Sequence, residues 1–536
     1  MHACETIGAV NVIFTDKTGT LTQNSMTVVD KDIKGDNDGM MNLIGSINST
    51  ANWSNNGLPL GNPTECAILK SIGENLSESL RERFEVLSRI PFSSAWKYMV
   101  TYAKDRESGE EVIVIKGAPE VVSKIIKNES FLAEVALQQD RGRRAISAAI
   151  LKGMNYNTIK AKLDARESLS GCDCEYVGTW FIEDPVRSDV PSAIEKCYQA
   201  GIDVVMMTGD NFKTGGEIAR QAGFQNIWAI EAKDFWTAIE HPKNGRIMPN
   251  VIARCTPTNK LDILKWAQEK GLVCAMTGDG VNDSPSLNYA DVGIAMGTGT
   301  SVAKEAADIV LLDDAFPSIV TGVKWGRSLY KNIKNFFFLQ LSINVSACLI
   351  VLFGPLVGVE MPFTVTQFLW INLVMDSLAA IALASEPADE RVLRDKPRDH
   401  NEFIIDKALA RSIFGFGGFV WILCTFILWG MNNIEAMSGV TSTDFFAFYM
   451  MINWWNMFNA RVIGKNKSTF DGLTNNIKFT AILAFVMVTT ILIVQFGGKV
   501  FSTEPLSFSK WISLILVTSP VMIFREIYFQ LFGKKR

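Results

Sequence analysis

The sequence predicts a multidomain protein in which a soluble α/β part precedes an α-helical membrane part. Its 536 residues exceed one compact domain and correspond to about three or four domains of roughly 150 residues each. Up to about residue 320, short apolar runs end in polar loops that carry Gly and Asp. From about residue 336, uncharged stretches of the length of a bilayer span recur. This division explains how the chain can be 48% hydrophobic and yet 20% charged.

Composition argues against several classes of function. The chain has 52 Lys and Arg against 56 Asp and Glu, and this net charge of −4 gives no support for nucleic-acid binding. It has three His, none with a catalytic-looking neighbour, so histidine-based catalysis is not expected. The nine Cys are scattered and odd in number, which argues against a disulfide framework.

Three apolar runs in the first part predict buried strands of a parallel sheet. They cover residues 11–20, 202–210 and 272–280, and continuous apolar runs of this kind suit strands that are covered on both faces. Each run carries an Asp just past the carboxyl end of its strand: Asp16, Asp210 and Asp279. Open α/β sheets bind their ligands at this edge, so we expect the three carboxylates to face one site.

The segment Asp16-Lys17-Thr18-Gly19-Thr20-Leu21-Thr22 predicts a phosphoryl acceptor. A carboxylate at a strand end can attack a phosphoryl group and form an aspartyl-phosphate intermediate. Lys17 can offset charge, and the Gly and Thr residues, Thr18 among them, allow backbone and hydroxyl groups to approach phosphate oxygens. The segment Thr277-Gly278-Asp279-Gly280-Val281-Asn282-Asp283 adds two carboxylates.

Together with Asp16, the carboxylates of Asp279 and Asp283 suit Mg²⁺, which takes one or two carboxylates plus phosphate and water oxygens. Phosphoryl transfer depends mainly on positioning and charge neutralisation. The remaining predicted contacts to the transferring group are Thr208, Gly209, Asp210 and Lys260.

Six apolar stretches in the second part predict six transmembrane helices. About 20 apolar residues span a bilayer, and the fourth and sixth stretches are the weakest. The stretches are 336–359, 361–385, 412–434, 445–460, 479–498 and 511–524. Buried helices of a large soluble core are the alternative.

Loop charges predict the orientation of these helices. Residues 386–407 and 461–478 carry five and four Lys or Arg, and the tail from Arg525 carries four, whereas the alternate loops hold only Lys499 and Lys510. This asymmetry places the soluble part and the C-terminus in the cytoplasm. Residues 1–25 do not resemble a signal peptide.

Asp376 is the only acidic residue inside the clear spans, and an intramembrane carboxylate is functional by default. Asn372 precedes it by four residues and therefore shares its helix face, and Asn344 lies in the middle of the preceding span. These oxygen donors suit a hard cation such as Ca²⁺. The structural alternative is an Asp–Asn pair that only links helices.

The motifs DKTGTLT and TGDGVND resemble those of P-type ATPases, cation pumps of the haloacid-dehalogenase-like superfamily, and the resemblance runs through essentially the whole chain. Related phosphatases carry a second Asp two positions after the nucleophile, which serves as acid and base for hydrolysis. This chain has Thr18 at that position, so we expect the phosphoenzyme to persist. The resemblance implies a Rossmann-like phosphorylation domain with an inserted α+β nucleotide-binding domain. The implied divisions are 1–27 and 181–317 for phosphorylation, 28–180 for nucleotide binding and 318–536 for the stalk and membrane helices.

Motifs within the insertion match the family's ATP site: GNPTECAIL, PFSSAWKYM, KGAPE and GRR. By resemblance, Phe92 stacks on adenine, Lys97 and Lys116 line the pocket, Glu65 bonds the base side, and Arg144 approaches the phosphates. Ser94 and Trp96 stand where relatives can have basic residues. The segment Asp184-Pro185-Val186-Arg187 resembles the family's interdomain hinge. The implied ATP-binding set is Glu65, Phe92, Lys97, Lys116, Gly117, Arg144, Arg254 and Asn282.

The segments NLVMDSLAAIALASEP and SINVSA resemble calcium pumps of the plasma-membrane subgroup. Ala347 stands where two-site pumps carry Glu, which predicts one Ca²⁺ per cycle. The alternatives are a pump for Na⁺, K⁺, H⁺ or Mn²⁺, or a truncated nucleotide-binding membrane protein that does not transport.

Compared with the family, the chain begins just ahead of the Asp16 strand. We therefore expect it to be the C-terminal portion of a pump, which needs the actuator domain and the first four spans as a missing part. The short stretch after the last span favours a bacterial-type pump in the plasma membrane over animal relatives with a calmodulin-binding tail.

Overall fold

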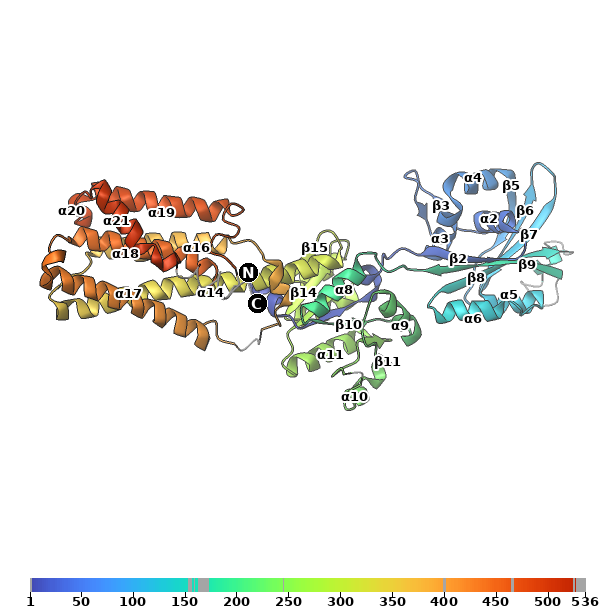
Figure 1. Cartoon of the computed structure of the whole chain (residues 1–536). Coiled ribbons are helices and arrows are strands. Elements are labelled where there is room, and N and C mark those ends of the chain that lie inside the picture. The colour runs from blue at the N-terminus through green and yellow to red at the C-terminus, as the bar shows by residue number, and fades with distance from the viewer. Residues whose placement is uncertain are drawn as a thin grey trace. The chain divides into compact units, whose positions relative to one another are not determined.

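The computed structural model describes residues 2–152, 157–158, 160–161, 173–243, 245–398, 402–463, 467–523 and 526. The charged tail beyond Glu526 lies outside these residues. The chain forms two compact units, Val10–Thr321 and Met1–Ala9 with Gly322–Arg536. The first unit contains both large sheets and the second is helical throughout its described part (Figure 1).

A seven-stranded sheet contains all three strands that the sequence predicts. Every neighbouring pair is parallel, as expected, and β1 lies in the centre between β10 and β13. The strands are buried because helices α10 to α13 pack their apolar side chains against the sheet. In spatial order the strands are β11 Ala229–Glu231, β12 Val251–Ala253, β10 Asp203–Met207, β1 Val12–Thr15, β13 Cys274–Gly278, β14 Val292–Met296 and β15 Ile309–Leu311.

The helices of this sheet follow its strands in sequence. Between β10 and β11 lies α9 Phe212–Gln221, and between β12 and β13 lies α11 Pro257–Glu269, whose Thr256 N-cap accepts from the amide of Asn259. This alternation is the order expected of a parallel sheet. The other helices are α8 Val190–Gln199, α10 Phe235–Ala238, α12 Ser284–Tyr289 and α13 Ser301–Ala306.

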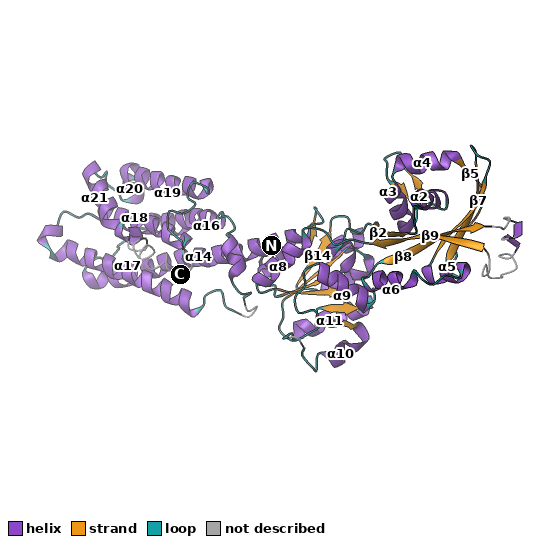
Figure 2. Cartoon of the chain, turned by 45° about the vertical axis from the view of Figure 1, so that its right-hand side comes forward, coloured by secondary structure: helices purple, strands orange, loops and turns teal. Residues whose placement is uncertain are grey.

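An antiparallel six-stranded sheet lies between β1 and β10 in sequence. The chain enters it on β2 and leaves it on β9, which pair with each other, so the whole sheet is one insertion. Helices α2 to α4 cover one face and α5 and α6 the other (Figures 1 and 2). The strands are β2 Thr27–Ile33, β9 Asp173–Glu183, β8 Arg144–Lys152, β7 Glu111–Gly117, β6 Tyr98–Asp105 and β5 Phe84–Ile90. The helices are α2 Asp38–Ile47, α3 Pro63–Ile72, α4 Glu74–Arg83, α5 Pro119–Ile126 and α6 Leu132–Asp140.

Helices occupy all six predicted membrane stretches. Among the described residues, four helical segments are long and apolar enough to cross a bilayer: Phe316–Val357, Val365–Ala384, Lys407–Asn433 and Ile477–Phe496. The other two positions hold α18 Ser442–Arg461, which is buried along most of its length, and the shorter α21 Phe508–Thr518. The count of six crossings therefore stays a prediction. The remaining elements are α14 Phe316–Phe353, α15 Val365–Leu369, the π-helical turn η6 Trp370–Met375, α16 Asp376–Ala384, α17 Lys407–Asn433 and α19 Ile477–Phe496.

Candidate phosphotransfer, nucleotide and cation sites

Three carboxylates meet at the carboxyl edge of the parallel sheet. Asp16 follows β1, Asp279 follows β13, and Asp283 lies in the short helix η4 Val281–Asp283. They offer oxygen atoms that all lie within 4.8 Å of one another. Lys260 of α11 reaches into the cluster, with its Nζ 2.7 Å from an Asp16 oxygen and 2.8 Å from an Asp283 oxygen. The structure thus brings together residues from three separate segments of the chain, at positions 16, 260 and 279–283.

The electrostatics of this cluster suit a bound cation. Burial raises the pKa of the Asp16 carboxyl, Lys260 opposes that rise, and Asp283 adds to it. Burial and the charges of Asp16 and Asp283 also raise the pKa of Asp279. Burial disfavours the charged form of Lys260, but the two carboxylates outweigh it and raise its pKa. Three acids share one cation within the chain, so a divalent ion would relieve their repulsion.

The loop after Asp16 requires a glycine beside this cluster. Gly19 has a φ of 74°, and a Cβ built on it would lie 2.5 Å from the Oδ2 of Asp279. A larger residue would therefore be strained and would push into the carboxylates. Arg187 donates to the backbone carbonyls of Gly19 and Thr22, and Asp184 accepts from the Thr22 hydroxyl at 2.5 Å. The predicted hinge segment thus contacts the loop that follows Asp16.

Lys17, in this loop, contacts the segment that follows β10. That segment contains Thr208, Gly209 and Asp210. The Nζ of Lys17 is 2.6 Å from Asp210, and the hydroxyl of buried Thr208 accepts from the Asp210 amide at 3.1 Å. Arg254 donates its own backbone amide to the Asp210 carbonyl at 2.8 Å and has a φ of 52°. Such a conformation is uncommon for a residue other than glycine and is often found at functional sites.

The antiparallel sheet carries a pocket of about 550 Å³ where the sequence implied an ATP site. Phe92 is 58% exposed at this pocket, an unusual setting for a large aromatic side chain. The Nζ of buried Lys116 lies 3.0 Å from Glu65, which also accepts from the amide and hydroxyl of Thr50. These contacts outweigh burial and lower the pKa of Glu65. Of the implied set, Glu65, Phe92, Lys116, Gly117 and Arg144 line the pocket, and Thr50, Asn62 and Thr64 join them.

Three residues of the implied ATP set do not line this pocket. Lys97 has a φ of 60° and places its Nζ 3.5 Å from Glu120. Arg254 lies 3.5 Å from Glu231 at the parallel sheet, and Asn282 is exposed in η4 next to Asp283. Asn282 therefore lies next to the carboxylate cluster, whereas the described contacts of Arg254 are to Glu231 and to the Asp210 backbone.

The intramembrane carboxylate lies directly after a π-helical turn. Asp376 follows η6 and is 4% exposed, and neither of its oxygens has a hydrogen-bond partner among the described residues. The Oδ1 of Asn372, one turn earlier, is likewise buried and unpartnered within that part of the chain. Asn344 is only half-buried on α14, whereas the adjacent Ile343 faces the core. π-Helical turns are often found at functional sites.

Sequence reasoning missed a polar face of α18 in the same helical core. Asn453 and Asn456 are fully buried, and their Oδ1 atoms have no hydrogen-bond partner in the region that the structure describes. Tyr449 on this helix donates to the backbone carbonyl of Ile343, next to Asn344, at 3.0 Å. The sequence does contain a pattern that predicts this face. The polar residues at 449, 453, 456 and 459 interrupt an apolar stretch and share one face of a helix.

Family models match three separate parts of the chain. Residues 240–320, which include Lys260, Asp279 and Asp283, match the haloacid dehalogenase-like hydrolases. This part of the parallel sheet is therefore similar to that class of hydrolase.

The other two family models describe parts of ATPases. Residues 40–150 match the cytoplasmic domain N of P-type ATPases, and residues 360–531 match the C-terminus of cation-transporting ATPases. These two stretches are therefore similar to P-type and cation-transporting ATPases.

Curated relatives are similar to the chain along nearly its whole length. The chain is 33% identical to plasma membrane calcium-transporting ATPase 1 of Mus musculus, over 98% of the chain and 49% of the relative. It is 33% identical to calcium-transporting ATPase 2 of Oreochromis mossambicus, over 98% of the chain and 54% of the relative. It is 34% identical to calcium-transporting ATPase 4 of Homo sapiens, over 96% and 47% respectively. The chain thus spans about half the length of these relatives.

Proposed function

We propose that this chain carries the catalytic and cation-binding parts of an ATP-driven pump that exports Ca²⁺ from the cytoplasm through an aspartyl-phosphate intermediate. The observation that carries the proposal is the cluster of Asp16, Asp279, Asp283 and Lys260. The apolar helices of the same chain hold the carboxylate of Asp376, which has no hydrogen-bond partner among the described residues. Similarity to calcium-transporting ATPases supports Ca²⁺ as the cation.

In this proposal Asp16 is the nucleophile. Lys260 holds one of its oxygens, which leaves the other carboxylate oxygen to attack a phosphoryl group. Lys17 and the groups of Thr208, Gly209 and Asp210 lie where they can bind the oxygens of the transferring group. Asp16, Thr18, Asp279 and Asp283 would hold Mg²⁺, which neutralises phosphate charge when bound. The close approach of the three carboxylates fits such an ion.

ATP would occupy the pocket of the antiparallel sheet. Phe92 offers an exposed ring for stacking on adenine, and Lys116 provides a buried cation whose partner Glu65 fixes its position. Arg144 donates to Thr64 at 2.8 Å at the pocket wall, where a phosphate could replace that hydroxyl. We divide the chain for this function into 1–27, 28–180, 181–317 and 318–536, with Asp184–Arg187 as the hinge.

The transported cation would bind at Asp376, Asn372 and Asn344. The unpartnered oxygens of Asp376 and Asn372 support this site, because a lone carboxylate at bilayer depth requires a cation or a proton. Ala347 contributes no ligand, which supports one Ca²⁺ per cycle. Asn453 offers a further buried oxygen from α18.

The membrane placement follows from loop charges. Lys and Arg gather in 386–407 and 461–478, so we place these segments and the catalytic unit in the cytoplasm, with six helices crossing the plasma membrane. The assignment to a bacterial membrane stays a prediction.

The test is phosphorylation of the purified chain by γ-labelled ATP. We expect an acid-stable, hydroxylamine-labile adduct that depends on Ca²⁺ and disappears in Asp16→Asn. The matched control is Asp262→Asn, an exposed position on α11, which should label normally. Undiminished labelling of Asp16→Asn would contradict the nucleophile assignment.

The choice of cation separates the remaining alternatives. Labelling that depends on Na⁺, K⁺ or Mn²⁺ in place of Ca²⁺ would identify a pump for another cation. Nucleotide binding without any labelling would identify a nucleotide-binding membrane protein that does not transport.

A further inference from the structure

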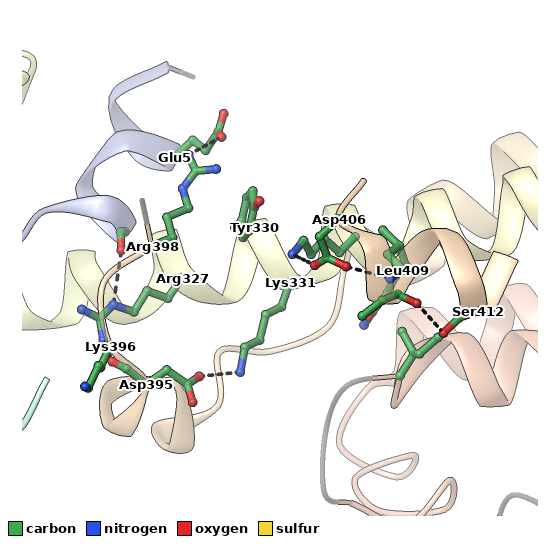
Figure 3. A pocket seen from close by; sticks show the side chains of 15 residues that line it. Glu5, Arg327, Tyr330, Lys331, Asp395, Lys396, Arg398, Asp406, Leu409 and Ser412 are labelled. Atoms are coloured by element: carbon green, nitrogen blue, oxygen red, sulfur yellow. Dashed lines mark hydrogen bonds and ion pairs between the residues drawn. The ribbon is translucent and has the colours of Figure 1, made fainter. Parts of the chain in front are cut away.

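The ion pairs of this chain differ in how far they are shielded from water. The pair of Lys331 with Asp395, shown in Figure 3, joins side chains that are 34% and 52% exposed, and such pairs contribute little. The pair of Arg143 with Glu183 joins side chains that are only 20% and 14% exposed. Because water screens this second pair less, it can hold its two partners in a fixed geometry. Neither partner lines the ATP pocket or belongs to the carboxylate cluster, so the proposed sites leave this pair without a role.

Arg143 lies in the turn that leads the chain from α6 into β8. Gly142 has a φ of 82°, which residues other than glycine rarely adopt, so the helix ends and the chain turns at this position. The backbone amide of Arg143 donates to the Gln138 carbonyl at 3.2 Å and closes the turn. Arg144 then begins β8. Neighbouring residues of an extended chain point to opposite sides, so we expect the two arginines to serve different faces of the antiparallel sheet.

The contacts of the two arginines agree with this expectation. Arg144 lines the ATP pocket and donates to the Thr64 hydroxyl of α3 at 2.8 Å. Arg143 donates instead to the side-chain oxygen of Gln138 on α6, at 2.6 Å. Figures 1 and 2 show α3 and α6 on opposite sides of the antiparallel sheet. One arginine thus contacts the nucleotide pocket, and its neighbour in the chain contacts the opposite face.

Arg143 also binds both strands by which the chain enters and leaves the antiparallel sheet. Its Nε donates to Glu183, the last residue of β9, at 3.3 Å, and its Nη1 donates to Asp30 of β2 at 3.4 Å. The two strands pair directly with each other. One guanidinium therefore holds two carboxylates that lie on paired strands and would otherwise repel each other.

Glu183 lies directly before the predicted hinge segment. The next residue, Asp184, accepts from the Thr22 hydroxyl at 2.5 Å, and Thr22 lies at the end of the loop that follows Asp16. A continuous path of contacts therefore runs from the ATP pocket to this loop. It consists of two pairs of consecutive residues, 143–144 and 183–184, which one ion pair joins.

We propose that the Arg143–Glu183 ion pair transmits nucleotide binding in the pocket to the hinge, and that Arg143 is thereby a positioning residue for phosphoryl transfer. A phosphate bound by Arg144 would take the place of the Thr64 hydroxyl and shift the start of β8. Arg143 would carry that shift to Glu183 and the hinge. Positioning matters because a misplacement of about 1 Å can cost roughly a hundredfold in rate. The inference rests on the proposed function, since it requires ATP in this pocket and Asp16 as the nucleophile.

The first test separates nucleotide binding from chemistry in the full chain. Arg143→Met keeps the side-chain stem and removes the charge, so the phosphorylation rate at saturating ATP, measured by rapid quench, should fall about tenfold. The dissociation constant for ATP, measured by calorimetry, should change less than about twofold, because Arg143 does not line the pocket. Arg143→Lys keeps the charge and should restore much of the rate. The matched control is Arg141→Met, an exposed arginine of the same turn, which should react normally.

Two results of this test would overturn the proposal. One is an unchanged phosphorylation rate in Arg143→Met, and the other is a loss of ATP affinity as large as the loss of rate, which would indicate general damage to the pocket. A double-mutant cycle then tests the ion pair itself. Glu183→Gln should slow phosphorylation about as much as Arg143→Met, and the two changes together should slow it no further. Additive losses would show that the two residues act separately and would overturn the proposed link.

Hydrogen exchange gives a readout that does not depend on phosphorylation. The β,γ-methylene analogue of ATP should slow exchange in α3 and in residues 183–187 of the unsubstituted chain. In Arg143→Met the slowing should persist in α3 and be lost in residues 183–187. Equal slowing of both segments in Arg143→Met would overturn the proposal. Failure of the unsubstituted chain to bind the analogue at all would overturn the proposed function itself, and this inference with it.

Discussion

Asp16 and Asp376 are the two carboxylates on which the proposed function depends, and their surroundings are opposite. Asp16 lies beside two further carboxylates and is paired with Lys260 at 2.7 Å. Asp376 is more deeply buried, and its oxygens lack hydrogen-bond partners among the residues described. The Asp16 site thus contains its own cation, Lys260, whereas the Asp376 carboxylate requires a cation or a proton from outside.

Because the surroundings of the two carboxylates differ, the two sites can be tested separately. Removing the cation from the Asp16 site should damage chemistry at every Ca²⁺ concentration. Removing the charge from the Asp376 site should change the Ca²⁺ concentration that is needed and leave the chemistry intact.

The largest effect is expected for Lys260→Met. The substitution removes the charge that links Asp16 and Asp283, so the three carboxylates lose the cation that pairs with two of them. Loss of such a preorganised electrostatic contact costs roughly a hundredfold to a thousandfold in rate. The phosphorylation rate should fall by this factor at saturating Ca²⁺ and ATP, measured by rapid quench. Lys270→Met, at the exposed end of α11, is the control and should react normally.

The next effect is expected for Asp376→Asn. The amide keeps the size of the side chain but loses the negative charge that attracts a divalent cation. We expect the loss of this attraction to cost about 3 kcal/mol of binding free energy, or a hundredfold in Ca²⁺ affinity. The Ca²⁺ concentration for half-maximal phosphorylation should rise by about that factor, while nucleotide binding stays unchanged. Ser377→Ala changes the adjacent exposed position and should not shift the Ca²⁺ dependence. An unchanged Ca²⁺ dependence in Asp376→Asn would place the cation site elsewhere.

The two sites also differ in how far the sequence predicted them. The sequence predicted that Asp16, Asp210 and Asp279 each follow the carboxyl end of a buried parallel strand, and the structure agrees, because apolar runs and turns are local signals. That these three strands are neighbours in the sheet is a finding of the structure. In the membrane part, the charge of Asp376 was visible, but Asn453 and Asn456 were not singled out. Neutral amides in an aromatic-rich helix such as α18 carry no strong compositional signal, and their burial depends on tertiary packing.

The nucleotide pocket shows that the spacing of motifs in the sequence does not fully predict which side chains line a pocket. Glu65, Phe92, Lys116 and Arg144 do line one pocket, although they come from different elements. Lys97 does not, since its positive φ turns the chain and brings its side chain near Glu120. A motif fixes the order of residues along the chain, whereas the direction of each side chain depends on local backbone geometry.

A smaller effect is expected at this pocket from Lys116→Met. Lys116 is buried, and its loss removes a candidate nucleotide contact and leaves Glu65 without its cation. The dissociation constant for ATP should rise about tenfold to thirtyfold, measured by calorimetry on the full chain. Lys124→Met, exposed on α5, is the matched control. Unchanged affinity in Lys116→Met would exclude this pocket as the ATP site while leaving the Asp16 assignment untouched.

The smallest effect concerns the pH dependence of pocket stability. Lys116 and Thr50 outweigh burial and lower the pKa of Glu65 from its ordinary value of 4.5, so its ionised form stabilises the fold. That contribution, about 1 to 2 kcal/mol, is fully present above the unfolded pKa and is lost as pH falls through the folded value. Hydrogen exchange in α3 should therefore accelerate more on acidification, after correction for intrinsic rates, in the unsubstituted chain than in Glu65→Gln. Glu82→Gln, an exposed change on α4, should keep the full pH response. An identical pH response in Glu65→Gln and the unsubstituted chain would show that the Glu65 charge does not stabilise the pocket.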